Sequence, residues 1–388
     1  AADAVRFDRA YASSTWTKPS VASMLTGVHP RTHGVLELDH ALPADAVTMA
    51  ERLRAAGWAT GAVVSHHLIS RAFGYEQGFE RFRDDQGRGH RYVSSPAVTR
   101  QAIEMIDALA AGERPFFLLV HYFDPHFMYL RHDDVRFAGD APERIDVDRS
   151  FGELQDMEPP LDAGEIGHLV ATYDEEIRFT DRWIGELLDA LRARGLYDDA
   201  FIALTADHGE AFFEHGTIGH STDLHDEQAR VPLLVRWPRG EAAGSVVASP
   251  VSIVALAATT AEAAGLDADA DAFQEASLRA LVRGERAPAP VFLEIDYERL
   301  GAKTKPRERF GTTHQAALVD GPFKLLLDKT SGSAALYDLA ADPGEQRDVA
   351  AAHVDVAQAL GRALAERMQQ LPRASARARQ QDRLGRLD

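Results

Sequence analysis

The chain has 388 residues, of which 45% are hydrophobic, enough to build one large α/β domain or a domain with a smaller lobe. Its net charge of -18, from 42 basic and 60 acidic residues, argues against nucleic acid or an anionic membrane as a partner, because both require a basic surface. The absence of cysteine excludes disulfides and thiolate metal sites, and no segment approaches the roughly 20 apolar residues that cross a bilayer.

Short apolar runs alternate with longer amphipathic segments through much of the chain. The runs predict buried strands at 59–64, 116–120, 201–206 and 231–237. The amphipathic segments predict helices at 46–57, 96–111 and 166–195. This alternation predicts an α/β fold with a mainly parallel central sheet sandwiched by helices.

The pattern changes near residue 291. Short strands follow one another closely at 291–295, 315–320, 323–328 and 335–339, which predicts a small antiparallel sheet, and a helix is predicted at 353–370. Segments 131–165 and 265–290 are expected to be loops or insertions. We therefore expect an α/β core at 1–290, a C-terminal antiparallel subdomain at 291–372, and a charged, loosely ordered tail at 373–388.

The strand at 201–206 runs directly into Asp207, His208 and Gly209. Sites in open α/β sheets lie beyond the carboxyl ends of strands, and this pair offers an oxygen and a nitrogen ligand to a divalent metal. Gly209 would let the backbone turn sharply after them. The alternative is a helix-capping aspartate beside a core histidine.

Three nearby histidines favour a metal or proton-transfer site. His220 is the candidate among them, whereas His215 and His225 taken singly are interpreted as surface residues.

A second strand end, in "PFFLLVHYFDPHFMY" (115–129), carries His121, Asp124 and His126. The proline before His126 restrains the loop, because its ring locks one backbone dihedral. We interpret His126 as functional and expect it to face the same sheet edge as Asp207. His121 is better explained as a hydrogen-bonded core histidine.

The third stretch is "SSTWTKPSVASMLTGVHPRTHGV" (13–35), in which Thr17 precedes a proline that suits the first turn of a helix. A helix N-terminus favours an anion, so a hydroxyl at that point would lie against a bound oxyanion. An alcohol is a weak nucleophile at neutral pH, and a metal on Asp207 and His208 would lower its pKa. Three other hydroxyls are rivals, those of Ser14, Thr15 and Ser20.

Together these stretches resemble the sulfatases of the alkaline phosphatase superfamily over nearly the whole chain. "TKPSVASMLTG" resembles the sulfatase signature, "TADHGE" the later metal-binding segment, and "HYFDPHFMY" the mid-chain histidine segment. "GWATGAVVSHHL" resembles the segment Gly-Lys-x-His-Leu, which implies a substrate-binding role for His67 and places Ser65 where the family has lysine. Thr17 stands where sulfatases have the Cys or Ser that becomes formylglycine, and Val21 stands where that modification normally has Arg. The resemblance therefore implies direct attack by Thr17, with Lys18 as a substitute for the missing lysine.

The family pattern begins with a strand that ends in paired acidic metal ligands. "VRFDRAYA" matches a point well inside that pattern, so we expect the core to be N-terminally incomplete and to lack this strand. A metal on Asp207, His208 and Thr17 alone would then be under-coordinated unless water completes the shell.

We therefore expect a metal-dependent hydrolase of sulfate or phosphate/phosphonate esters, with a small anionic ester as substrate and Ca, Mn, Zn or Mg as cofactor. Thr17 would attack sulfur or phosphorus, and His126 or His220 would protonate the leaving alcohol. The alternatives are a degenerate, non-catalytic sulfatase-fold binding protein and a phospho-alcohol transferase. The sequence leaves open the metal, the compartment and whether the chain forms a homo-oligomer.

Overall fold

The strands and helices of the protein belong to two units in the computed structural model, which describes residues 2–87, 92–132, 134–145, 149–266, 272–297 and 313–374. The first unit draws on residues 1–49, 199–215 and 220–388, and the second on residues 50–198 and 216–219. Among the described residues, no helix combines the length and apolar character that a bilayer span requires.

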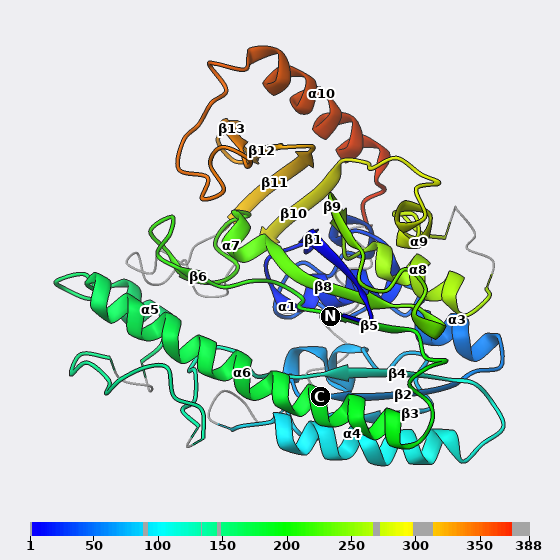
Figure 1. Cartoon of the computed structure of the whole chain (residues 1–388). Coiled ribbons are helices and arrows are strands. Elements are labelled where there is room, and N and C mark those ends of the chain that lie inside the picture. The colour runs from blue at the N-terminus through cyan, green and yellow to red at the C-terminus, as the bar shows by residue number, and fades with distance from the viewer. Residues whose placement is uncertain are drawn as a thin grey trace. The chain divides into compact units, whose positions relative to one another are not determined.

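The first unit contains a four-stranded sheet in the order β5-β8-β1-β9 (Figure 1). Its strands are β1 (Val5–Tyr11), β5 (Ile202–Thr205), β8 (Arg230–Arg236) and β9 (Val246–Ser252). β8 is antiparallel to both β1 and β5, whereas β9 is parallel to β1. Because β1 and β5 each oppose β8, they run in the same direction and their carboxyl ends lie at the same edge of the sheet.

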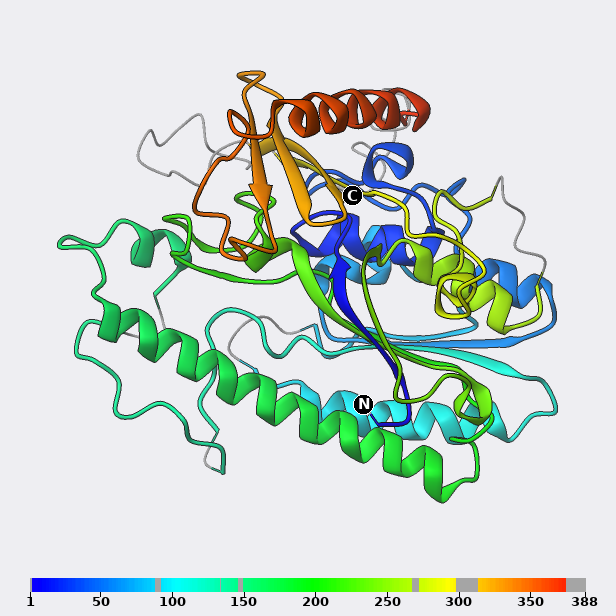
Figure 2. The same ribbon diagram turned by 45° about the horizontal axis from the view of Figure 1, so that its top comes forward.

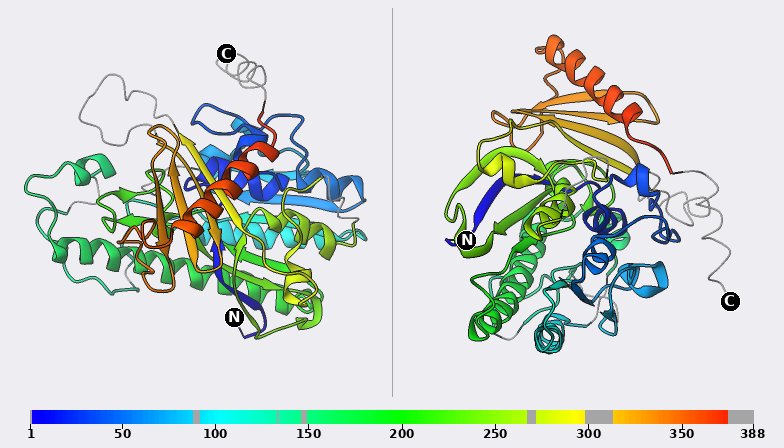
Figure 3. Two further views of the ribbon diagram at one scale, coloured as in Figure 1. Left: turned by 90° about the horizontal axis from the view of Figure 1, so that it is seen from above. Right: turned by 90° about the vertical axis from the view of Figure 1, so that its right-hand side faces the viewer.

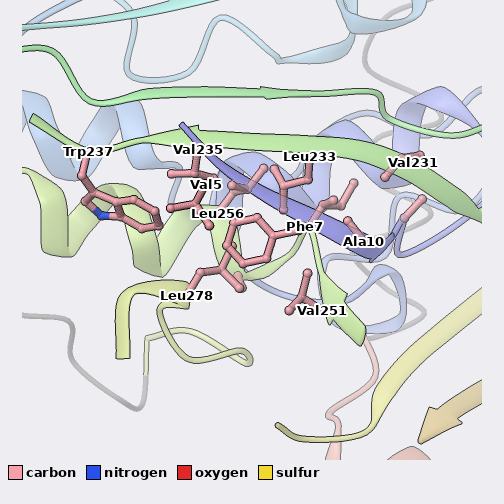
Figure 4. Packing of buried hydrophobic residues seen from close by; sticks show 13 residues of the cluster. Val5, Phe7, Ala10, Val231, Leu233, Val235, Trp237, Val251, Leu256 and Leu278 are labelled. Carbon is pink, nitrogen blue, oxygen red and sulfur yellow. The ribbon is translucent and has the colours of Figure 1, made fainter. Parts of the chain in front are cut away.

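Helices pack on this sheet through its apolar side chains. The helices of the first unit are α1 (Thr17–Thr26), α2 (Pro30–His33), α7 (Asp226–Ala229), α8 (Ala255–Ala263), α9 (Leu278–Val282) and α10 (Val354–Gln370). A two-residue strand, β6 (Ala211–Phe212), and a 3-10 turn, η3 (Pro238–Gly240), complete this part. Figure 4 shows Phe7 of β1 and Leu233 of β8 packed with Leu256 of α8 and Leu278 of α9. Buried apolar area of this kind supplies the main stabilisation of such a layer.

A second, separate sheet in the same unit is antiparallel throughout. Its strands are β10 (Val291–Tyr297), β11 (Thr313–Asp320), β12 (Phe323–Asp328) and β13 (Ala334–Asp338), paired in chain order. Helix α10 lies across one face of this sheet (Figure 3). Leu360 and Leu364 of the helix pack there against Phe292, Leu325 and Leu336.

The second unit is built around a three-stranded parallel sheet in the order β3-β2-β4. Its strands are β2 (Ala59–Val64), β3 (Arg81–Arg83) and β4 (Phe116–His121), with β7 (Ile218–Gly219) as a further short strand. Its helices are α3 (Met49–Ala55, whose first residue belongs to the first unit), η1 (His67–Ile69), η2 (Arg71–Phe73), α4 (Ser95–Ala110), α5 (Phe151–Gln155) and α6 (Ala163–Ala193). α4 packs on β2 and β4, and α6 runs alongside α4 (Figure 2).

The predicted fold class is confirmed: the chain is α/β, with a separate small antiparallel sheet near its C-terminal end. The predicted strands at 59–64, 116–120, 201–206 and 231–237 correspond to β2, β4, β5 and β8. The segments predicted to be loops contain two short helices, α5 and α9, and the first residues of α6. Several elements were not predicted: strands β1, β3, β6, β7 and β9 and helices α2, α7 and α8. The division at residues 290 and 372 remains a prediction, and the tail from residue 375 lies outside the described residues.

Candidate active site

Thr17 is the first residue of helix α1, immediately beyond the turn that follows β1. Trp16 before it is extended (φ -158°, ψ 161°) and gives the helix no side-chain cap. The first turn contains no acidic residue either. The positive end of the helix therefore meets the Thr17 hydroxyl without a competing carboxylate in its own first turn.

Asp207 and His208 follow β5 directly and lie beside Thr17. Oγ1 of Thr17 is 3.3 Å from Nε2 of His208, and Oδ2 of Asp207 is 3.5 Å from the same nitrogen. The three side chains come together because β1 and β5 end at the same sheet edge. The His208 side chain is 8% exposed and that of Asp207 is 19% exposed, so both are shielded without being sealed from solvent.

The hydrogen bonds of His208 define which nitrogen carries the proton. Nδ1 lies 2.8 Å from the carbonyl oxygen of Gly209, so Nδ1 donates and the lone pair of the neutral ring is on Nε2. That lone pair faces both the Thr17 hydroxyl, which can donate to it, and a carboxylate oxygen of Asp207, which cannot. A carboxylate oxygen facing an imidazole lone pair at 3.5 Å is favourable only when a proton or a cation lies between them.

This donor set fits a divalent cation. Oxygen and imidazole nitrogen are ligands that Zn²⁺ and Mn²⁺ accept, and ligands about 2.1 Å from an ion stand about 3.4 Å apart in a tetrahedral shell. The two separations, 3.3 and 3.5 Å, match that spacing. Thr17, Asp207 and His208 are thus the residues that could hold such an ion.

Gly209 is required here by close packing rather than by an unusual backbone angle. Its N–H donates to the carbonyl of Gln228 at 2.7 Å. A Cβ at this position would lie 2.2 Å from the carbonyl oxygen of Glu227, well inside any permitted contact. Glycine is therefore needed at position 209 because the 227–228 backbone approaches closely, and not for the sharp turn that the sequence suggested.

His220 lies next to His208, with ring centroids 4.3 Å apart. Its Nδ1 is 2.9 Å from Oε1 of Glu210, so Nδ1 donates to the carboxylate and Nε2 carries the lone pair of the neutral ring. The Glu210 side chain is 5% exposed. A buried carboxylate on one nitrogen of a histidine holds the ring in one orientation and stabilises its protonated form.

The family model named Sulfatase matches residues 1–266, more than half of the chain. The chain belongs to the sulfatase family. A second model, N-sulphoglucosamine sulphohydrolase, C-terminal, matches residues 214–374 of this sulfatase-family chain.

Relatives and solved structures agree with this assignment. The ulvan-active sulfatase of Formosa agariphila is 27% identical over 266 residues, which cover 61% of this chain and 50% of that protein. The N-acetylglucosamine-6-O-sulfatase of Bacteroides thetaiotaomicron is 23% identical and covers 89% of this chain and 76% of that protein. The phosphonate monoester hydrolase of Agrobacterium radiobacter has the same fold, with a TM-score of 0.75 at 20% identity over 96% of this chain and 90% of that one. The chain thus spans about half the length of the first relative.

Two of the three rival hydroxyls donate to backbone carbonyls of this sulfatase-family chain. Oγ1 of Thr15 donates to the carbonyl of Asp223 at 2.8 Å, and Oγ of Ser20 donates to the carbonyl of Asp207 at 2.5 Å. Ser14 is buried. The hydroxyl of Thr17 is therefore the one that the structure places beside His208.

Lys18, the residue predicted to replace the family's lysine, is buried inside the first unit. Its side chain is fully buried, and its ammonium donates to the carbonyl of Leu38 at 2.6 Å. Burial lowers the pKa of this lysine to about 7, and the nearby Asp39 carboxylate opposes that shift. The ammonium of Lys18 is thus directed at the backbone of Leu38, and its substrate-binding role stays a prediction.

The second unit carries the remaining predicted residues. His126 stacks on Phe123 with ring centroids 4.4 Å apart, and His66 meets the His126 ring edge-on at 5.7 Å. His67, the residue that the family pattern selects, is exposed and meets Phe73 edge-on. His66 is buried, and its Nδ1 accepts the N–H of Leu68 at 2.9 Å. The sequence could not show which of these two adjacent histidines is buried.

His215 and His225 are not the surface residues that the sequence suggests. Their side chains are 16% and 12% exposed, and their rings stack with centroids 3.6 Å apart. Nδ1 of His215 lies 2.7 Å from Glu227, and Nδ1 of His225 lies 3.2 Å from Asp223. Desolvation alone would lower the pKa of His215, but the Glu227 hydrogen bond and charge raise it overall. We interpret the group as an ion-pair cluster apart from the threonine site.

Proposed function

We propose that this protein hydrolyses sulfate or phosphate/phosphonate esters through Thr17. The observation that carries the proposal is the 3.3 Å approach of the Thr17 hydroxyl to Nε2 of His208 at the start of α1, beside Asp207. Membership of the sulfatase family supports the reaction class. The relatives add to this support, since two are sulfatases and the structural neighbour is a phosphonate monoester hydrolase.

Each residue then has a definite task. Thr17, Asp207 and His208 would hold a divalent cation, which when bound supplies the positive charge that lowers the pKa of the hydroxyl. Oγ1 of Thr17 gives up its proton to solvent water and forms a bond to sulfur or phosphorus, and the bond from that atom to the ester oxygen breaks. The helix N-terminus beneath Thr17 stabilises the negative charge on the transferred group.

His220 gives the proton that the leaving alcohol needs. Its Nδ1 donates to Glu210, so Nε2 is the nitrogen that delivers the proton, and the carboxylate favours the protonated ring that must exist before transfer. Water then releases the product from Thr17. The roles predicted for His126 and His67, in the second unit, remain predictions.

The type of ester is decided by the nucleophile. A threonine phosphoryl ester can be hydrolysed by attack of water at phosphorus, whereas a threonine sulfate cannot use the elimination that a formylglycine hydrate permits. We therefore expect phosphate or phosphonate monoesters and diesters to be turned over faster than sulfates.

The test uses four substrates: 4-nitrophenyl sulfate, 4-nitrophenyl phosphate, bis(4-nitrophenyl) phosphate and 4-nitrophenyl phenylphosphonate. Turnover of at least one is expected in the wild type, with a loss of at least about a hundredfold in Thr17→Ala. Mass spectrometry of acid-quenched enzyme should find the transferred group on the peptide that contains Thr17. Turnover that survives Thr17→Ala would overturn the assignment, and no turnover of any substrate would favour a non-catalytic binding protein.

A further inference from the structure

Gln228 joins the segment that carries His220 to the segment that carries His208. It belongs to the short helix α7, and it is 0% exposed. Its Oε1 accepts the N–H of Thr222 at 3.2 Å, and its Nε2 donates to Oγ1 of the same threonine at 2.7 Å. Its backbone carbonyl accepts the N–H of Gly209 at 2.7 Å. One residue therefore holds Thr222, two positions after His220, and Gly209, which directly follows His208.

The chain between His220 and Thr222 needs such support, because Ser221 has a positive φ of 67°. This left-handed conformation is unfavourable for any residue that carries a side chain, and it persists only where the surrounding contacts impose it. One such contact is the N–H of Ser221, which donates to the carbonyl of Thr15 at 2.9 Å. A second is the pair of hydrogen bonds between Gln228 and Thr222.

The strain at Ser221 gives the Gln228 side chain an effect on the histidine next to it. Without the Gln228 amide, the turn would relax toward an ordinary negative φ at Ser221, which rotates the backbone that carries His220. The ring of His220 now lies with its centroid 4.3 Å from that of His208. Relaxation of the turn would move it from this position beside the proposed nucleophile.

Helix α7 is a firm support for this contact, because its first residue is anchored inside the first unit. Nζ of Lys324 donates to Oδ1 of Asp226 at 2.9 Å, and the hydroxyl of Tyr11 donates to Oδ2 at 3.2 Å. Lys324 and Tyr11 are both 0% exposed. The N–H of Asp226 donates to Oε2 of Glu345 at 2.6 Å. A buried, hydrogen-bonded network of this kind fixes the backbone two residues before Gln228.

We propose that Gln228 is a positioning residue: through Thr222 it holds His220 in the orientation from which Nε2 protonates the leaving alcohol. The proposal rests on the proposed function for the reaction, but the orientation of His220 can be measured without turnover. Gln228 acts through Thr222 and not on a reacting atom, so its loss should lower kcat and leave substrate affinity almost unchanged.

The first experiment measures kcat and KM for two esters of the acid class that the enzyme turns over, the phenyl ester and the 2,4-dinitrophenyl ester. Gln228→Met removes both hydrogen bonds to Thr222 and nearly keeps the side-chain volume. It should lower kcat for the phenyl ester by about tenfold or more at nearly unchanged KM, because phenolate needs a proton to leave. The 2,4-dinitrophenolate leaves without one, so kcat for its ester should fall by less than about threefold. Equal losses for the two esters would overturn the proposal.

Gln274→Met is the matched control, because Gln274 makes the same pair of hydrogen bonds elsewhere in the first unit. Its Oε1 accepts the N–H of His29 at 2.7 Å, and its Nε2 donates to Oγ1 of Thr32 at 2.9 Å. This variant should lower Tm through the same kind of loss and keep the wild-type ratio of the two kcat values. A change in that ratio as large as the one in Gln228→Met would show that lost stability is the cause, and would overturn the proposal.

Thr222 supplies a second pair of variants, should Gln228→Met impair folding. Thr222→Val removes the hydroxyl that accepts from Gln228 and keeps the shape of the side chain, whereas Thr222→Ser keeps the hydroxyl. The ratio of the two kcat values should change in Thr222→Val and stay near that of the wild type in Thr222→Ser. Wild-type kcat for the phenyl ester in Thr222→Val would overturn the proposal.

The second experiment observes His220 by proton NMR without turnover. The hydrogen on its Nδ1, bonded to Glu210, should give a downfield signal that is missing from the spectrum of His220→Gln. This signal should shift or broaden in Gln228→Met and Thr222→Val and stay in place in Gln274→Met. An unchanged signal in the first two variants would reject the positioning role and leave ester hydrolysis standing. A shifted signal without turnover of any ester would support the positioning of His220 and reject the proposed reaction.

Discussion

The carboxylate of Glu210 lies 2.9 Å from Nδ1 of His220. Glu210 itself follows His208, the histidine that faces Thr17, by two residues. This hydrogen bond leaves Nε2 of His220 as the nitrogen that can exchange a proton with a substrate. Glu210 contacts no substrate atom in the proposed reaction, so it acts as a positioning residue.

We expect Glu210→Gln to lower kcat by about tenfold to a hundredfold with little change in KM, because an amide no longer favours the protonated His220. Steady-state kinetics with a 4-nitrophenyl ester would show this. A substrate whose leaving group needs no proton, such as 2,4-dinitrophenyl phosphate, should be affected far less. Glu366→Gln, an exposed change on α10, is the control. Equal losses with both leaving groups would argue against an acid role for His220.

A chelator should remove the activity. We expect dialysis against EDTA to abolish turnover and to lower Tm, since Asp207 and the lone pair of His208 face each other at 3.5 Å without a cation between them. Addition of Mn²⁺, Zn²⁺, Ca²⁺ or Mg²⁺ in turn should restore both, and the ion that does so at the lowest concentration identifies the site.

Asp207→Asn supplies the matched variant for that measurement. Calorimetric titration of EDTA-treated protein should give metal binding in the wild type and binding at least about tenfold weaker in Asp207→Asn. Asp199→Asn, on the surface before β5, should bind as the wild type does. Wild-type affinity in Asp207→Asn would show that the ion binds elsewhere.

Much of the fold could be predicted because buried strands appear in the sequence as short runs of apolar residues. "ATGAVV" became β2 within its predicted limits, and the strand before Asp207 was predicted within a residue at each end. The approach of Thr17 to His208 was expected from the family resemblance and not from the strand pattern, because β1, the strand before Thr17, was not predicted. By contrast, β1 carries Arg6, Asp8 and Arg9 among its apolar residues. These charged residues break the apolar run, so the strand was not recognised from the sequence.

Other parts of the site depend on contacts that no local pattern encodes. Glu210 pairs with His220 across ten residues, and nothing in either residue's neighbours points to the partner. The burial of Lys18 follows from the path of the chain at Leu38, a segment without periodicity. The antiparallel direction of β8 was missed because its run of apolar residues reads like a buried parallel strand, although Arg230 and Pro232 are exposed in the structure.

The docking of α10 on the antiparallel sheet should be a major source of stability for that part. Leu364 is 1% exposed and packs among Phe292, Leu325 and Leu336. We expect Leu364→Ala to lower the free energy of unfolding by about 2–5 kcal/mol, through lost burial and the cavity left behind. Urea denaturation followed by circular dichroism measures it.

Val354→Ala provides the contrast for that prediction, because Val354 lies at the exposed start of the same helix. It should change the free energy of unfolding by no more than about 0.5 kcal/mol. A similar effect from both variants would mean that α10 does not contribute through its buried face.

His33 is a buried histidine that the fold holds in its neutral form. Its Nδ1 accepts the N–H of Val35 at 3.1 Å, so the ring proton is on Nε2, which lies 3.1 Å from Oγ of Ser23. Desolvation by complete burial lowers its pKa from 6.5 to about 3. A proton added to Nδ1 would break the bond to Val35 and leave a buried charge.

This histidine should make the protein sensitive to mild acid. The unfolded chain takes up the proton near pH 6.5 and the folded chain only near pH 3, so the stabilisation is complete above pH 6.5 and is lost as the pH falls between these values. At about pH 5 the loss amounts to about 2 kcal/mol. His33→Gln, which keeps a side-chain donor near Ser23, should show a correspondingly smaller fall in the free energy of unfolding between about pH 7.5 and pH 5, measured by urea denaturation. His353→Gln is the control and should retain the wild-type fall, because His353 is exposed. If the free energy of unfolding falls equally in the wild type and in His33→Gln, protonation of His33 does not cause the loss of stability in acid.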